Sequence, residues 1–162
     1  MELLKKPIFR VPLVLGLSGV LCRLLTCFIS VVSVRLQQAQ GPDPVTGVYH
    51  ISTGHATVIM AVLSFLIFWA AGWRFLRDLS RKQLLLSASV MVLWNTVLLV
   101  WEQARQAAGS YSLWCYHLYA TTESMMWMDQ IMFRVLGEVS VPAVIPGLFT
   151  PLLYAFLGKK AA

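Results

Sequence analysis

The feature of this sequence that most constrains its fold is a set of four apolar stretches separated by polar segments. A helix that crosses a bilayer needs about 20 mostly apolar residues, and each stretch is close to that length. The whole chain has a mean hydropathy of +0.71, with 58% hydrophobic and 12% charged residues, outside the range of ordinary soluble domains. The sequence therefore predicts an all-α integral membrane protein whose spans are residues 11–34, 55–73, 84–101 and 139–157.

The length of the chain limits it to one unit. With 162 residues it holds a single domain, so we expect residues 1–162 to form one bundle of four antiparallel transmembrane helices. The net charge is +6, but the basic residues flank the apolar spans, where they meet lipid headgroups. We therefore expect the lipid bilayer, and not a nucleic acid, as the partner of these charges.

The basic residues also predict the orientation of the spans. Lysine and arginine in short loops are retained on the cytoplasmic side of a membrane. With the N-terminus inside, the cytoplasmic segments hold nine of the 13 basic residues, whereas most acidic residues fall outside. We expect a multi-pass protein of the cell membrane with both termini in the cytoplasm. The nine cytoplasmic basic residues are Lys5, Lys6, Arg10, Arg74, Arg77, Arg81, Lys82, Lys159 and Lys160.

The outer loop before the last span contains a segment, residues 118–136, whose pattern is typical of an amphipathic helix. At 100° per residue, its leucines and methionines gather on one side and Glu123, Gln130 and Arg134 on the other. Such a helix lies flat on the outer leaflet or caps the bundle. A fifth span is disfavoured because a charged group near the bilayer centre costs about 2.5–3.5 kcal/mol. The remaining alternative is a re-entrant or tilted segment that faces the bundle.

The fourth predicted span carries Pro142, Pro146, Gly147 and Pro151. Each proline removes a backbone donor and clashes with the preceding turn, so this helix is expected to kink or to begin irregularly. Irregular backbone at membrane depth is tolerated only where other protein or a wet cavity satisfies it. We expect the fourth span to pack against the others, around a small cavity if one exists.

Arg23 is the sharpest single signal, because it is a charged side chain near the middle of a predicted span. An ionisable residue at that depth faces the bundle interior or a partner. A second interpretation is that the Arg23 side chain extends along its helix to reach a lipid headgroup. A third interpretation is a direct contact with a ligand or an ion. Its candidate partners in the chain are Asn95, backbone carbonyls freed by Pro142 or Pro146, and Glu123 from a dipping outer segment.

Several titratable side chains fall on the predicted outer face. Histidines together with carboxylates are common ligands of metal ions. Their spacing here matches no metalloenzyme motif. The favoured interpretation is therefore that the histidines are loop residues and the carboxylates lie at the membrane interface. Glu102 and Arg105 are expected to form an ion pair at a helix end. The candidate outer cluster comprises His50, His55, Glu102, His117, Glu123 and Asp129.

Sulfur-containing side chains also gather in the outer segment. Met128 and Met132 are four residues apart and share a helical face, with Cys115 nearby. Thioether and thiolate groups prefer soft metals such as Cu(I), although methionine stripes are more often adaptable apolar packing. We therefore treat these residues as weak soft-metal candidates, and we expect no cofactor.

These observations favour a non-catalytic role. The first hypothesis is a small membrane subunit or accessory protein that associates with a membrane partner or with itself, partly through Arg23. The second is a small-molecule or ion transporter with its site near Arg23, Asn95 and the proline-broken fourth span. A metal-dependent membrane enzyme that uses the outer histidines and carboxylates is the third.

Overall fold

Three long apolar helices dominate the computed structural model, which describes residues 6–49, 51–110, 112–137 and 140–159. They are α1 (Pro7–Gln38), α2 (Gly54–Leu76) and α3 (Arg81–Ala107), and each is long and apolar enough to cross a membrane. They contain the first three predicted spans and extend beyond them into polar residues. The extension follows from composition, because the flanking arginine, lysine and glutamine residues are good helix formers. In the described part of the chain there is no strand.

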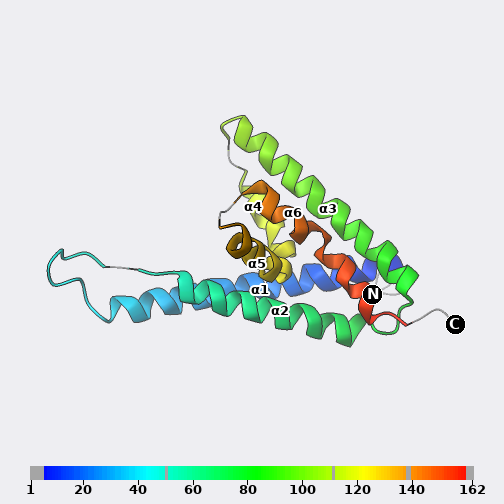
Figure 1. Ribbon diagram of the computed structural model, residues 1–162, viewed down its shortest axis with the longest axis horizontal. Coiled ribbons are helices and arrows are strands. Elements are labelled where there is room, and N and C mark those ends of the chain that lie inside the picture. The colour runs from blue at the N-terminus through cyan, green and yellow to red at the C-terminus, as the bar shows by residue number, and fades with distance from the viewer. Residues whose placement is uncertain (1–5, 50, 111, 138–139, 160–162) are drawn as a thin grey trace.

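Helices α1 and α2 lie side by side, whereas α3 diverges from them along its length (Figure 1). The start of α1, the turn between α2 and α3 and the end of the described chain all meet at one end of the molecule. There Arg10 Nη1 lies 2.6 Å from Asp78 Oδ2, and the Lys159 N–H donates to the Leu79 carbonyl at 3.1 Å. The hydrogen bond from Arg10 holds the pKa of the Asp78 carboxyl below its ordinary value.

The turn between α2 and α3 is fixed by a capping box at the start of α3. The Ser80 hydroxyl accepts from the Gln83 N–H at 3.4 Å, and the Ser80 N–H donates to Gln83 Oε1 at 3.0 Å. These bonds satisfy backbone donors that the first turn of a helix leaves free. The turn therefore needs few residues, and α3 starts beside the end of α2.

The apolar stretch predicted as the fourth span is not one regular α-helix. It forms α6 (Val141–Phe149), continued by a 3₁₀ segment, η3 (Thr150–Leu157); residue 139 lies outside the described residues. Pro146 stands inside α6 and Pro151 near the start of η3, so the α-helical ladder cannot run through the segment. Together α6 and η3 make 17 residues, fewer than any of the three helices that are long enough to cross a membrane.

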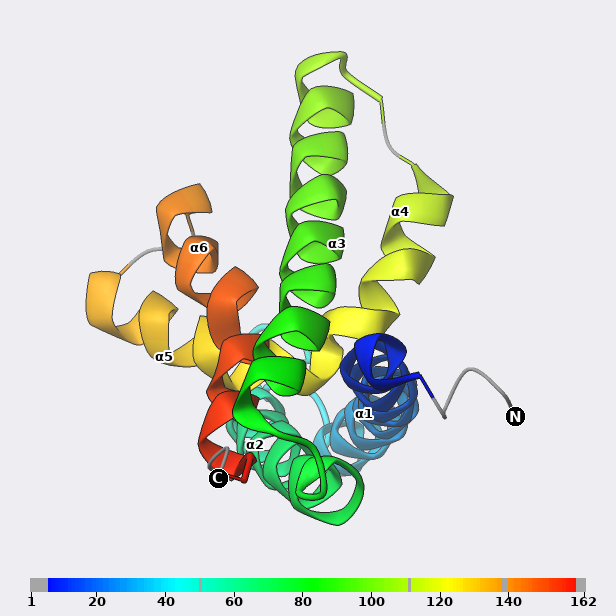
Figure 2. The same cartoon turned by 90° about the vertical axis from the view of Figure 1, so that its right-hand side faces the viewer.

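The predicted amphipathic segment also differs from expectation. It divides into the 3₁₀ segment η2 (Tyr119–Met125) and α5 (Met126–Leu136), and a short helix, α4 (Leu113–Leu118), leads into it. The chain passes here between α3 and the α1–α2 pair, with α4 on one side of α3 and α5 on the other (Figure 2). Ser124, Met125 and Trp127 are buried. The segment therefore packs against the long helices.

The hydrophobic core joins these pieces at the end where the chain segments meet. Tyr154 of η3 is fully buried, stacks on Phe68 of α2 at 4.3 Å between ring centroids, and donates from its hydroxyl to the Phe68 carbonyl at 2.9 Å. Gly72 makes room for this ring, because a Cβ there would overlap Tyr154. The last segment is thus anchored to α2 although it is not a regular helix. Other core members are Val11, Leu15, Leu76, Leu84 and Ala88.

Candidate polar site around Arg23

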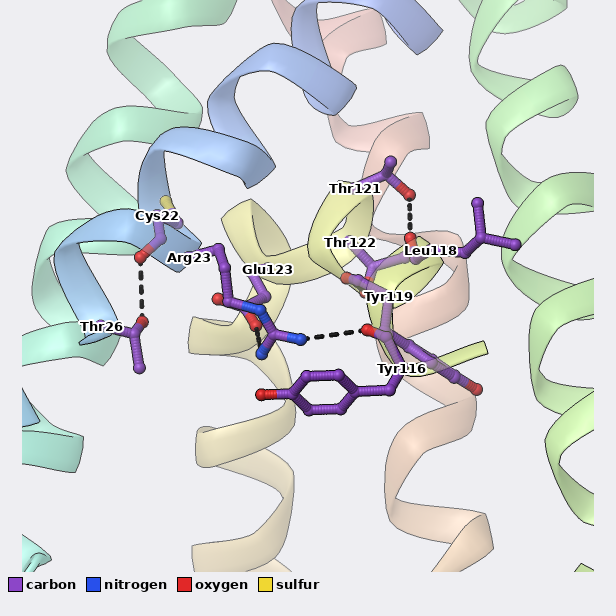
Figure 3. A network of polar contacts seen from close by, with 9 residues as sticks. All are labelled: Cys22, Arg23, Thr26, Tyr116, Leu118, Tyr119, Thr121, Thr122 and Glu123. Carbon is purple, nitrogen blue, oxygen red and sulfur yellow. Dashed lines mark hydrogen bonds and ion pairs between the residues drawn. The ribbon is translucent and has the colours of Figure 1, made fainter. Parts of the chain in front are cut away.

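The positive charge of Arg23 in α1 is neutralised by a carboxylate of the same chain. Its Nη1 forms an ion pair with Glu123 Oε1 of η2, and its Nη2 donates to the Tyr116 carbonyl at 3.0 Å (Figure 3). The guanidinium carbon also lies 4.1 Å from the centroid of the Tyr116 ring, a cation–π contact. The side chains of Arg23 and Glu123 are 21% and 14% exposed. Of the partners considered from the sequence, the structure thus brings Glu123 to Arg23.

The approach of η2 to α1 depends on a glycine one turn before Arg23. A Cβ at Gly19 would overlap the backbone carbonyls of Ala120 and Thr121. Within η2, the Thr121 and Thr122 hydroxyls donate to the carbonyls three residues earlier, at 2.7 and 2.8 Å. Close backbone contact and this local bonding position Glu123 opposite Arg23.

Asn95 of α3 meets the same segment from the other side. It is 3% exposed, its Nδ2 lies 3.9 Å from Met125 Sδ, and its Oδ1 is buried without a hydrogen bond to any described residue. Arg23 and Asn95 therefore do not touch each other directly. They contact η2 at positions 123 and 125, so the two polar residues singled out within the spans converge on one short 3₁₀ segment.

A cavity of about 200 Å³ lies beside Arg23. Within the described chain, Arg105 makes no ion pair or hydrogen bond from its side chain, and Glu102 accepts instead from Gln106 Nε2 at 3.3 Å. The expected Glu102–Arg105 ion pair is therefore wrong, and both charges remain available to the cavity. Its lining comprises Arg23, Glu102, Arg105, Gln106, Ser110, Ser112, Tyr116 and Tyr119.

A second cavity, of about 210 Å³, lies between α1 and α2, and α5 contributes to its lining. Its polar lining is hydroxyl and amide, without a charged side chain. Gln37 forms two hydrogen bonds with the backbone just before α2. Its Nε2 donates to the Ser52 carbonyl at 2.9 Å, and its Oε1 accepts from the Ser52 N–H at 2.5 Å. The polar residues of this cavity are Thr26, Ser30, Ser33, Gln37, Ser52, Thr53, Thr57 and Gln130.

The structure does not assemble the candidate outer cluster. His55 and His117 are exposed on different helices, and His117 lies edge-on to Tyr116 at 5.6 Å. Asp129 faces α6 instead. Among residues that the structure describes, no group of three histidine, cysteine or acidic side chains could hold a metal ion; His50 lies outside them.

The soft-metal candidates are likewise not drawn together by any contact. Met128 packs against the hydrophobic core, and Met132 is half-buried. The side chain of Cys115 lies outside the described part of the structure. For the methionines, the observed environment is the apolar packing that thioether side chains commonly provide.

Sequence reasoning did not identify Tyr116 or Gly147 as neighbours of charged side chains. Tyr116 contributes a carbonyl and a ring to Arg23, and no sequence pattern marks either role. Gly147 stands next to a proline, which predicts a break, but its contact with Asp129 depends on the packing of two helices. The chain matches no protein-family model, no curated protein and no solved structure in the three comparisons made with known proteins.

Proposed function

We propose that the protein is a small-molecule transporter of the cell membrane whose binding site is the cavity beside Arg23. The observation that carries this proposal is the cavity itself, which Arg23 and Glu102 line together with Arg105, a side chain that forms no ion pair within the described residues. The short helix α4 and the 3₁₀ segment η2 border it, and polar sites within membranes are commonly built where helices are discontinuous. The internal partner of Arg23 also removes the need for an acidic residue from another protein.

The charges of the cavity favour a small zwitterion. Arg23 is balanced by Glu123, which leaves the guanidinium of Arg105 for a phosphate or carboxylate and the carboxylate of Glu102 for an ammonium group. A volume of about 200 Å³ is below the range of drug-sized sites, so the ligand is small. A free amine-bearing solute and an ethanolamine headgroup share this chemistry.

Arg105→Ala is expected to abolish most ligand binding. Loss of a charge-assisted hydrogen bond costs about 1.5–3 kcal/mol, which corresponds to about tenfold to hundredfold weaker binding. The probe is ¹⁴C-phosphoethanolamine, measured by uptake into proteoliposomes and by equilibrium binding in detergent. Arg134→Ala is the matched control, because Arg134 is exposed on α5 and lines neither cavity.

The outcomes separate transport from headgroup binding. Uptake by the wild type and by Arg134→Ala, lost in Arg105→Ala, supports the proposal. Arg105-dependent retention of phosphatidylethanolamine over phosphatidylglycerol, without uptake of the soluble probe, assigns the cavity to a lipid and ends the transport proposal. Equal uptake and binding by the wild type, Arg105→Ala and Arg134→Ala would show that the cavity is not the ligand-binding site.

An accessory or subunit role is the second candidate, and the second cavity favours it. Serine, threonine and glutamine side chains form hydrogen bonds between helices in membranes, and Thr26, Ser30, Ser33 and Gln37 line one face of α1. Ser30 is exposed. This uncharged face replaces Arg23 as the contact that a membrane partner or a second copy would use.

The four crossings and the cytoplasmic termini also belong to the proposal. The nine α-helical residues of α6 and the eight 3₁₀ residues of η3 rise about 1.5 and about 2.0 Å each, which adds to about 30 Å. That length matches the hydrocarbon core of a bilayer. Basic residues of α1, α2 and α3 gather at the end where the described chain finishes, which supports placing that end in the cytoplasm.

Reporter fusions test this topology. We expect alkaline phosphatase to be active after residues 45 and 120, and a cytoplasmic reporter to be active after residue 78 and at the C-terminus of the full chain. Four crossings return the C-terminus to the cytoplasm, whereas three leave it outside. Export of residue 78 would reverse the orientation, and an exported C-terminus would reduce the bundle to three spans.

A further inference from the structure

One carboxyl oxygen of the half-buried Asp129 is covered where α5 meets α6. Oδ1 is buried, and Asp129 has no hydrogen bond or ion pair with any residue in the described chain. It contacts Gly147 so closely that a Cβ on Gly147 would overlap Oδ1. Gly147 follows Pro146 inside α6, so the missing side chain and the interrupted helix together form a notch that accommodates the carboxyl group.

Among the residues that the structure describes, the elements packed around Asp129 supply no compensating charge. Helix α6 contains no titratable side chain, and in η3 the Tyr154 hydroxyl is already bound to Phe68. In η2, Glu123 is paired with Arg23. Helix α2 carries His55 and Arg74 only near its two ends, and Arg134 of α5 is exposed.

Burial without a partner disfavours the charged form of a carboxyl group. Helix α5 is too short to be one of the spanning helices, and burial raises the pKa of Asp129 to about 7. Neither cavity is lined by this residue.

We infer that Asp129 is a proton-binding site at the contact between α5 and α6. With Gly147 seated on it, the carboxyl group holds a proton on one oxygen. On release the O–H bond breaks, the proton passes to water and the electron pair stays on the carboxylate. The site does not depend on the ligand proposed for the Arg23 cavity.

Infrared spectroscopy with isotope labelling tests this directly on the unmodified sequence. The chain has three aspartates, Asp43, Asp78 and Asp129. Asp43 Oδ1 accepts two backbone N–H bonds, and Asp78 is bound to Arg10, which holds the pKa of its carboxyl group below the ordinary value. Full-length protein carrying [4-¹³C]aspartate should show a ¹³C-shifted C=O band of a protonated carboxyl group at about pH 6 that disappears by about pH 8.

Two variants assign the band. Asp129→Asn should lack it, and Asp78→Asn, which alters an exposed aspartate, should keep it. Absence of a labelled protonated band above about pH 5, or its survival in Asp129→Asn, overturns the inference. Should Asp129→Asn fail to fold, Gly147→Ala decides: a Cβ there displaces the carboxyl group, so the band should shift or titrate at lower pH, and an unchanged titration would contradict the site.

Discussion

Glu123→Ala is expected to lower the free energy of unfolding by about 3 kcal/mol or more. Removing one partner of a buried ion pair leaves the other charge uncompensated, which typically costs about 3–5 kcal/mol. Arg23 would keep the Tyr116 carbonyl and ring, so the lower part of that range applies. Unfolding in mixed detergent micelles, followed by tryptophan fluorescence, measures the change.

Asp78→Ala is the matched control, because it also removes the carboxylate of an arginine pair. The side chains of Arg10 and Asp78 are 27% and 57% exposed, and exposed pairs contribute about 0–1 kcal/mol. The double variant Arg23→Met/Glu123→Leu should recover most of the stability lost in Glu123→Ala, since well-packed apolar replacements of buried pairs are often neutral. If Glu123→Ala costs no more than Asp78→Ala, the pair has no structural role.

Gly19→Ala should separate η2 from α1. The added Cβ would meet backbone carbonyl oxygens of Ala120 and Thr121, which cannot rotate away as a side chain can. Overpacking of this kind costs about 1–3 kcal/mol, and it also moves Glu123 away from Arg23. We expect lower thermal stability and loss of Arg105-dependent ligand binding.

Gly16→Ala provides the comparison within the same helix. A Cβ at Gly16 meets nothing within 4 Å, and alanine is a better helix former than glycine by about 1 kcal/mol. This variant should be as stable as the wild type or slightly more stable, with binding unchanged. Equal destabilisation by both substitutions would mean that helix flexibility, and not the contact with η2, explains the effect.

Hydropathy predicted the three long helices because their length and composition are local properties of the sequence. The fourth stretch is equally apolar, yet Pro146 and Pro151 direct it into α6 and a 3₁₀ continuation. Proline content predicted the irregularity but not its geometry. The residue at which the α-helix changes into a 3₁₀ helix depends on packing against α3 and α2. A local sequence pattern does not contain that information.

The position of Glu123 shows a second limit of periodicity. A regular α-helix over residues 118–136 places Glu123 on the polar face, but residues 119–125 form a 3₁₀ segment with fewer residues per turn. That change rotates the side chain toward Arg23. A partner for Arg23 was expected from the cost of a buried charge, and the structure selects Glu123 from the candidates by a change in helical pitch.

The ion pair has a consequence for how the chain is made. Arg23 and Glu123 are 100 positions apart, so a nascent protein whose first helix has left the ribosome does not yet carry the residue that neutralises it. Until synthesis reaches η2, Arg23 must be stabilised by water in the insertion machinery, by phospholipid or by a chaperone. The ion pair therefore forms only after most of the chain has been made.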